Sequence, residues 1–138
     1  MSRLLDYLRK IDAYVFEELI MTALEAQGIQ VMRNARYSGD GGSDGCFVLD
    51  NGLYLILAKR YQGSINADHV RAFGDLVRKE GARGGLFVHT GSTPPGTYRQ
   101  LASLKTVTLL SGQELVDLMQ ARPLRMFAAG RIVKASAS

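Results

Sequence analysis

The sequence predicts an α/β domain in which a mixed central β-sheet is flanked by helices, with the element order αβββαβαβα. Two observations support this prediction. In the first half, the turn Asp50-Asn51-Gly52 separates two short apolar runs, which is typical of an antiparallel β-hairpin. In the second half, apolar runs alternate with helical patterns, which is typical of parallel strands joined by crossover helices.

The first half contains one predicted helix and three predicted strands. Apolar residues at helical spacing cover the first 27 residues, and Gly28 is the expected end of that helix. The strands are predicted over residues 29–32, 46–49 and 53–60, with a polar turn over residues 33–45. The last two strands form the hairpin, so part of the sheet is antiparallel.

The second half contains three predicted helices and two predicted strands. Asn66 can cap a helix that runs to about Glu80, and a strand follows over residues 86–89. Thr93-Pro94-Pro95 resembles a capped helix start with proline in its first positions. After a strand over residues 107–110, the segment Ser111-Gly112-Gln113-Glu114 matches a capping box that begins the last helix.

Length and composition predict one compact domain over residues 1–122, followed by a tail over residues 123–138. The chain is 46% hydrophobic and 22% charged, as in an ordinary globular domain. It has no apolar run of about 18 residues and no signal segment, so we expect no membrane partner and a cytoplasmic location. The single cysteine, Cys46, excludes an internal disulfide framework and a multi-cysteine zinc site.

The chain carries a moderate positive charge. Seventeen Lys and Arg residues against 13 Asp and Glu residues give a net charge of +4. This surplus permits a polyanionic partner such as DNA, because cations that neutralise phosphates supply most non-specific affinity. One of these cations, Lys59, follows an apolar run, where a buried unpaired ammonium would be very costly. Lys59 therefore either reaches water without a further role or serves a site.

Five motifs occur in order along the chain. They are Phe16-Glu17-Glu18-Leu19, Gly28, Gly39-Asp40-Gly41-Gly42-Ser43-Asp44, Lys59-Arg60-Tyr61 and Ser111-Gly112-Gln113-Glu114-Leu115. Over residues 14–119 the chain resembles the catalytic domain of Mrr-type restriction endonucleases, within the PD-(D/E)xK nuclease superfamily. It is also similar to archaeal Holliday junction resolvases. The resemblance implies a restriction-endonuclease-like core.

The resemblance also implies a metal-dependent DNA-cleaving site with one position altered. The family's turn aspartate falls on Asp44, its lysine on Lys59, and its helix acid on Glu17 or Glu18. Asp44 would hold Mg²⁺ if the site is active. The remaining ligand position, two residues before the lysine, falls on Leu57, which has no oxygen to offer a metal. Residues i and i+2 of a strand share a face, so the motif is broken beside its own lysine.

We therefore expect a DNA-binding protein without cofactor, whose nuclease motif is broken at Leu57 and whose role is accessory or regulatory. The alternative is a Mg²⁺-dependent endonuclease or junction resolvase in which another acid has taken the missing position. A dimeric interaction module that binds no nucleic acid is a third possibility.

The candidates for DNA contact are basic or aromatic residues in turns and at strand ends. They are Arg33, Arg36, Tyr37, Lys59, Arg60, Tyr61 and Lys105. Together they would bind phosphates of double-stranded or branched DNA with little sequence readout. As solvated charges they need no function. His69 and His89 lie on different elements without a nucleophile at matching spacing, so we expect structural roles for both.

Two apolar segments lie at the ends of the predicted domain. Leu4, Leu5, Leu8 and Ile11 form a stripe near the N-terminus, and Leu124, Met126, Phe127, Ile132 and Val133 lie in the tail. Each segment folds back onto its own domain or packs on a second copy. Because isologous dimers are the commonest oligomers, we expect a homodimer.

Overall fold

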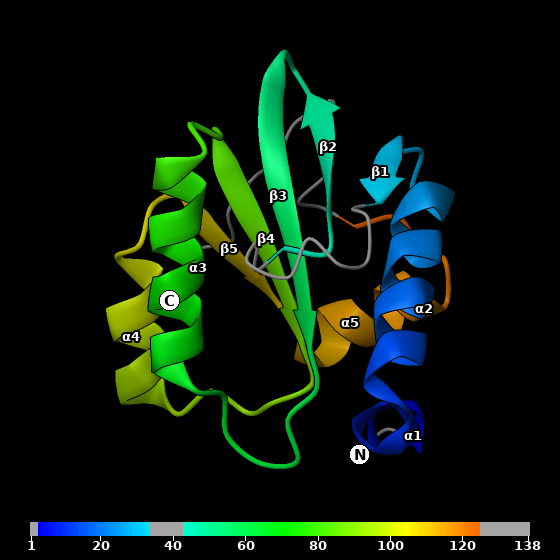
Figure 1. Cartoon of the computed structure of the whole chain (residues 1–138). Helices are drawn as coiled ribbons and strands as arrows, with labels where there is room; N and C mark the ends of the chain where they lie inside the picture. Colours follow the sequence, from blue (N-terminus) through cyan, green and yellow to red (C-terminus); the bar gives the residue numbers. More distant parts are fainter. Residues whose placement is uncertain (1–2, 34–42, 125–138) are drawn as a thin grey trace.

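The computed structural model describes residues 3–33 and 43–124. Its elements are α1 (Arg3–Lys10), α2 (Ala13–Ala26), β1 (Val31–Arg33), β2 (Gly45–Leu49), β3 (Gly52–Lys59), α3 (Ala67–Lys79), β4 (Gly84–His89), α4 (Pro95–Ala102), β5 (Val107–Leu110) and α5 (Gly112–Met119). Figure 1 shows the sheet between α2 and α3.

The five strands form one mixed sheet in the order β1-β2-β3-β4-β5. β1, β2 and β3 pair in antiparallel fashion, whereas β3, β4 and β5 are parallel. The hairpin turns at Asp50 and Asn51, whose φ angles of 52° and 63° are those that a two-residue turn of this kind requires. The predicted α/β class and the mixed sheet are confirmed.

The N-terminal segment forms two helices, so the prediction of a single helix over the first 27 residues is wrong. The break lies at Ile11 and Asp12. The Asp12 carboxylate caps α2 by accepting hydrogen bonds from the N–H groups of Tyr14, at 2.9 Å, and Val15, at 3.1 Å. The apolar stripe continues across the break, which explains why the pattern resembled one helix.

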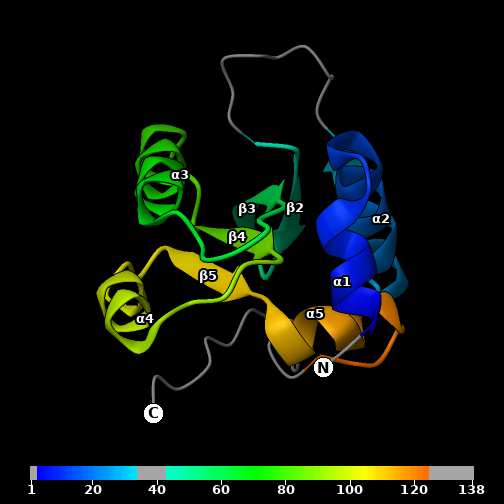
Figure 2. The same ribbon diagram turned by 90° about the horizontal axis from the view of Figure 1, so that it is seen from below.

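Each face of the sheet has its own core. On one face, α1, α2 and α5 contribute to a cluster that includes Phe16 and Ile56. On the other, α3 and α4 contribute to a cluster that includes Phe73 and Phe87. Figure 2 shows α3 and α2 on opposite sides of the sheet. The sheet is therefore covered on both faces, as expected of a sheet with parallel strands.

The N-terminal apolar stripe is buried within its own chain. Leu5 is 8% exposed and Leu8 is fully buried, while Leu4 and Ile11 pack against the same cluster. α1 also contacts α5. Of the two alternatives that the sequence left open for this stripe, the structure shows the first, because the core of its own domain covers it.

The helix starts differ in how well the sequence predicted them. Asn66 accepts a hydrogen bond from the N–H of Asp68 at 2.9 Å, which confirms the predicted cap. Ser111 precedes α5, but its hydroxyl makes no capping bond, and Gly112 has a φ of 57°. The capping-box prediction is wrong, because this left-handed residue makes the chain enter the helix by a different turn. α4 follows Pro94, which has no side-chain acceptor for a cap.

Gln27 fastens the far end of the described chain to the C-terminus of α2. Its Nε2 donates to the carbonyl of Arg122 at 2.7 Å, and its Oε1 accepts from the N–H of Leu124 at 3.2 Å. Leu124, which the sequence assigned to the tail, is 7% exposed and lies in the core. No helix within residues 3–33 and 43–124 is long and apolar enough to span a membrane.

Candidate functional site

The candidate site lies where β2 begins and β3 ends, which is one end of the antiparallel hairpin. Asp44 directly precedes β2. Its N–H donates to the carbonyl of Ile56 at 2.7 Å, and its Oδ2 accepts from the N–H of Ala58 at 2.8 Å. Both the main chain and the carboxylate of Asp44 are thus bonded to the backbone of β3. The carboxylate bonds Ala58, which directly precedes Lys59.

Leu57 and Lys59 share a face of β3, because they are two residues apart on one strand. Leu57 packs against the cluster formed with α3. Burial raises the pKa of Asp44, while the Ala58 hydrogen bond and the positive charge of Lys59 lower it. The positive charge of Lys59 therefore acts on Asp44. Leu57, an apolar residue, occupies the position before Lys59 on the same face of β3.

Glu17 is the acid of α2 that joins this cluster. Its pKa is raised to about 7, chiefly by burial, then by the negative charges of Asp44 and Glu18, against the lowering effect of Lys59. Glu18 has a different partner, because its Oε1 lies 3.3 Å from Nε of Arg33. The structure thus brings Glu17, Asp44 and Lys59 together, whereas the sequence left Glu17 and Glu18 as equal choices.

The donor set partly suits a divalent metal. Mg²⁺ is commonly held by one or two carboxylates and several waters, and Glu17 and Asp44 are two carboxylates that raise each other's energy when both are charged. One Asp44 oxygen is already engaged by Ala58. Leu57 supplies no oxygen, and no group of three or more His, Cys, Asp or Glu side chains suited to a metal occurs among the described residues.

Arg33, a candidate for DNA contact, is bound to α2. Its guanidinium lies 3.3 Å from Glu18, 2.9 Å from Glu25 and 3.2 Å from the hydroxyl of Thr22. These three contacts account for its nitrogens, and two carboxylates neutralise its charge. All three partners lie on α2, so Arg33 joins β1 to that helix.

Arg60 also has an internal use. Its Nη1 donates to the carbonyl of Arg9 at 3.1 Å, close to the C-terminus of α1, and its Nε is buried without a hydrogen-bond partner in the described structure. Arg60 directly follows β3, and this hydrogen bond directs its guanidinium toward α1. The sequence could not show this, because the partner is a backbone carbonyl 51 residues earlier.

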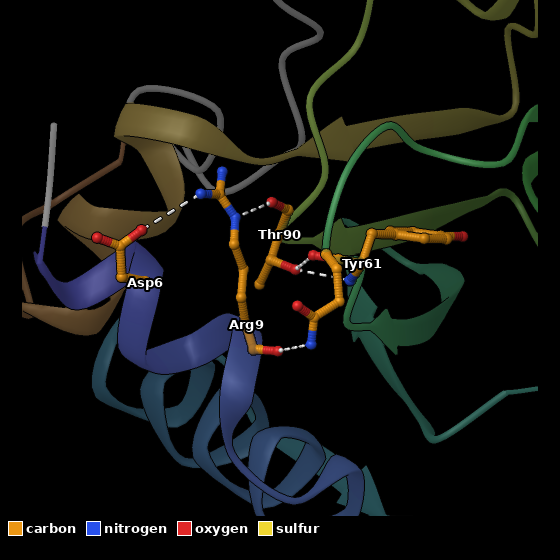
Figure 3. A network of polar contacts seen from close by, with 5 residues as sticks. Asp6, Arg9, Tyr61 and Thr90 are labelled. Atoms are coloured by element: carbon orange, nitrogen blue, oxygen red, sulfur yellow. Dashed lines mark hydrogen bonds and ion pairs between the residues drawn. The ribbon is translucent and has the colours of Figure 1, made fainter.

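Arg9 and Thr90 form a polar network that the sequence analysis missed (Figure 3). Arg9 Nε donates to the Thr90 carbonyl at 3.0 Å, and the Thr90 hydroxyl bonds both the N–H and the carbonyl of Tyr61, at 2.7 and 2.9 Å. Gln62 Nε2 donates to the Arg9 carbonyl at 3.3 Å. The network connects α1 to the residues that directly follow β3 and β4, close to Lys59 in the sequence.

Tyr61 packs inward beside two histidines. Its hydroxyl lies 2.7 Å from Nδ1 of His69, and its ring meets His89 edge to face. His89 is fully buried, its Nδ1 accepts from the N–H of Gly91 at 3.0 Å, and burial lowers its pKa to about 4. Burial raises the pKa of Tyr61 to about 12. Tyr61 and His89 therefore stay neutral near pH 7, and both support the end of β3 next to Lys59.

The remaining candidates lie elsewhere. Lys105 precedes β5, which runs parallel to β4 and β3, so it lies at the end of the sheet opposite Lys59. Arg36 and Tyr37 lie outside the described residues. Of the seven candidates, Lys59 is the one that the described structure places in the acidic cluster.

Comparisons with known proteins agree with this architecture. Residues 8–119 match the Mrr catalytic-domain model, whose description is restriction endonuclease. The type IV methyl-directed restriction enzyme EcoKMrr of Escherichia coli strain K12 is 27% identical over 125 residues, which cover 86% of this chain and 41% of that enzyme. The solved structure of the MspJI restriction endonuclease with a 27-mer oligonucleotide matches 86% of this chain and 30% of its own, at a TM-score of 0.62 and 22% identity.

The chain therefore spans less than half the length of the relatives that it matches. The matched family model, by contrast, covers most of this chain and extends over the helices, the hairpin and the cluster of Glu17, Asp44 and Lys59. The chain belongs to the Mrr-like restriction endonuclease family of the PD-(D/E)xK nuclease superfamily.

Proposed function

We propose that this chain is a DNA-binding domain that keeps the nuclease fold but does not cut, with an accessory or regulatory role. The observation that carries the proposal is Leu57, an apolar side chain on the face that Lys59 shares, where the family pattern requires an oxygen ligand. Its partner is double-stranded or branched DNA. The net charge of +4 and the oligonucleotide in the MspJI structure support this partner.

A second candidate function is Mg²⁺-dependent DNA cleavage, and Glu17 favours it. Glu17 and Asp44 are close enough for the charge of one to raise the pKa of the other. A divalent cation would relieve this repulsion and would lower the pKa of a bound water. Lys59 would then orient the phosphate and stabilise negative charge on it. In this candidate, Glu17 supplies the oxygen that Leu57 cannot.

One experiment separates the two functions. The purified chain is incubated with supercoiled plasmid in Mg²⁺ or Mn²⁺, and its binding to duplex and four-way junction DNA is followed by mobility shift over a range of salt. We expect retention that weakens steeply with salt, and intact plasmid. Metal-dependent cutting that Asp44→Ala and Glu17→Gln both abolish would support the second candidate instead. No binding to either DNA would leave the interaction-module function.

Lys59 should contribute to DNA binding, and Lys105 is the matched control. We expect Lys59→Ala to weaken binding by about fivefold at low salt and to reduce the salt slope by about one, because one phosphate contact is lost. Lys105→Ala removes the same charge at the opposite end of the sheet and should have little effect. Fluorescence anisotropy at four salt concentrations measures both. Equal losses for the two variants would mean that net charge, rather than the site, binds DNA.

Glu17 should make stability depend on pH. Its pKa is raised from 4.5 to about 7 on folding, so the folded chain binds the extra proton between these values. The free energy of unfolding should therefore fall as pH rises from about 4.5 to about 7, and level off above. Because the Glu17 side chain is only partly buried and solvent screens its charge, we expect at most about 1 kcal/mol. Urea unfolding at several pH values measures it, and Glu17→Gln should remove this component.

We also propose a homodimer and a cytoplasmic location. Support for the dimer comes from exposed apolar side chains at the junction of α1 and α2, where Tyr7 is 56%, Tyr14 57% and Val15 43% exposed. Sedimentation analysis at tens of micromolar checks the dimer, and a monomer at that concentration would contradict it.

A further inference from the structure

A groove lies along β5, bounded by residues 91–93 after β4, by α4 and by the start of α5. Its volume is about 310 Å³. Three consecutive residues of β5, Val107 to Leu109, line it, together with Leu101 of α4 and Glu114 of α5. Consecutive strand residues point to opposite faces of a sheet, so a groove that touches all three follows the edge of the strand. Figure 2 shows β5 with α4 and α5 on the two sides of it.

The backbone of β5 is available along this edge. Among the described strands β5 pairs with β4 alone. Gly85 is in register with Val107, and its N–H donates to the carbonyl of Thr106 at 2.7 Å. In a parallel ladder this bond places the N–H of Thr108 toward β4 and the N–H and carbonyl of Leu109 toward the groove. An edge strand of this kind is a template for a further strand.

The chain itself carries a segment that suits the groove. It leaves the described structure at Leu124, which is fastened to Gln27. The seven residues 125–131 span up to about 23 Å when extended, whereas α5 is about 12 Å long and has the groove at its beginning. The linking residues are therefore long enough for the segment after Arg131 to reach the groove.

The chemistry of this segment matches the lining. Ile132 and Val133 are β-branched residues of high strand propensity. Residues 125–138 carry three cations, Arg125, Arg131 and Lys134, and no Asp or Glu. The groove offers apolar side chains from α4 and β5, and one partly buried carboxylate, Glu114, whose pKa is raised by burial. A basic, apolar segment thus meets an apolar groove with an acid at one end.

We propose that residues 131–134 of the same chain add to the open edge of β5 as a further strand, in the groove between α4 and α5. The occupant is the chain's own segment, and main-chain hydrogen bonds to Leu109 supply the pairing. This inference is independent of whether the Asp44 end cuts DNA or only binds it.

Amide hydrogen exchange of the full chain tests the proposal residue by residue. The N–H of Leu109 should be protected from exchange to the same degree as the N–H of Thr108. The N–H of Thr108 donates to β4 and serves as the internal reference. Ile132→Asp combined with Val133→Asp should speed exchange at Leu109 at least tenfold and leave Thr108 nearly unchanged. The matched control, Ser136→Asp combined with Ser138→Asp, adds the same charge outside the segment and should alter neither.

Three outcomes would overturn the proposal. Unprotected amides at residues 131–134 in the natural sequence would mean that the segment does not pair. Protection of Leu109 that survives the Ile132 and Val133 changes would assign the groove to another occupant. Protection that grows with protein concentration, with a dimer in sedimentation, would assign it to the segment of a second copy.

Discussion

Replacing Leu57 by glutamate should raise the affinity of the chain for Mn²⁺ and Mg²⁺ by at least about tenfold. The new carboxylate would lie on the face of β3 that Lys59 shares, next to Asp44, and would join Glu17 as a third oxygen donor. Without metal, the added charge should lower the free energy of unfolding, since three carboxylates repel one another. Titration calorimetry with Mn²⁺ measures the first effect, and urea unfolding with and without metal measures the second.

Two variants control for the Leu57 experiment. Leu53→Glu places the same charge on the same face of β3, about 13 Å away along the strand, and should not bind metal. Leu57→Gln supplies a neutral oxygen and should give a smaller gain. If Leu57→Glu and Leu53→Glu behave alike, the position next to Asp44 is not a metal-ligand position. Gain of plasmid cutting by Leu57→Glu would show that the rest of the site is intact.

Replacing Arg60 by alanine should lower the free energy of unfolding by about 2 kcal/mol, while leaving the salt slope of DNA binding unchanged. The guanidinium donates to the Arg9 carbonyl at the end of α1, where a cation also interacts favourably with the helix dipole. A hydrogen bond from a charged group contributes about 1.5 to 3 kcal/mol. Its loss should also loosen the contact between α1 and Thr90. Urea unfolding measures the stability, and anisotropy at four salt concentrations measures the slope.

Arg60→Lys is the matched variant, because it keeps the charge but loses the planar fork of donors. We expect it to recover part of the stability. The contrast with Lys59→Ala is decisive, since the Arg60 guanidinium bonds the end of α1, whereas Lys59 acts on the charge of Asp44. If Arg60→Ala were fully stable and reduced the salt slope by about one, Arg60 would contact phosphate, and the internal role assigned to it would be wrong.

Local patterns in the sequence predicted most of the fold. The hairpin at Asp50 and Asn51 follows from residues that tolerate positive φ, and the cap of α3 follows from Asn66. The break at Asp12 was not predicted, because α1 and α2 both bury the same apolar stripe. The helical spacing of the apolar residues therefore continues across the break. The capping box at Ser111 failed because the φ of Gly112 cannot be deduced from its neighbours.

Only those residues of the candidate site that correspond to motif positions of the family could be predicted from the sequence. Asp44, Lys59 and Leu57 follow from their spacing around the hairpin, which the resemblance supplied. The choice between Glu17 and Glu18 required the position of Arg33, and the use of Arg60 required the position of α1. Both are contacts between segments distant in sequence, which no local pattern encodes.

The hydrogen bonds between Gln27 and the residues that follow α5 determine when this domain can fold during synthesis. Gln27 bonds Leu124, 97 residues later in the chain. A ribosome that adds about 5 to 20 residues per second needs about 5 to 20 s to cover that interval. Throughout this time Leu8, Phe16 and their neighbours lack the partners that α5 supplies. A nascent chain that stalls before α5 should therefore be a substrate for chaperones and proteases rather than a partly active domain.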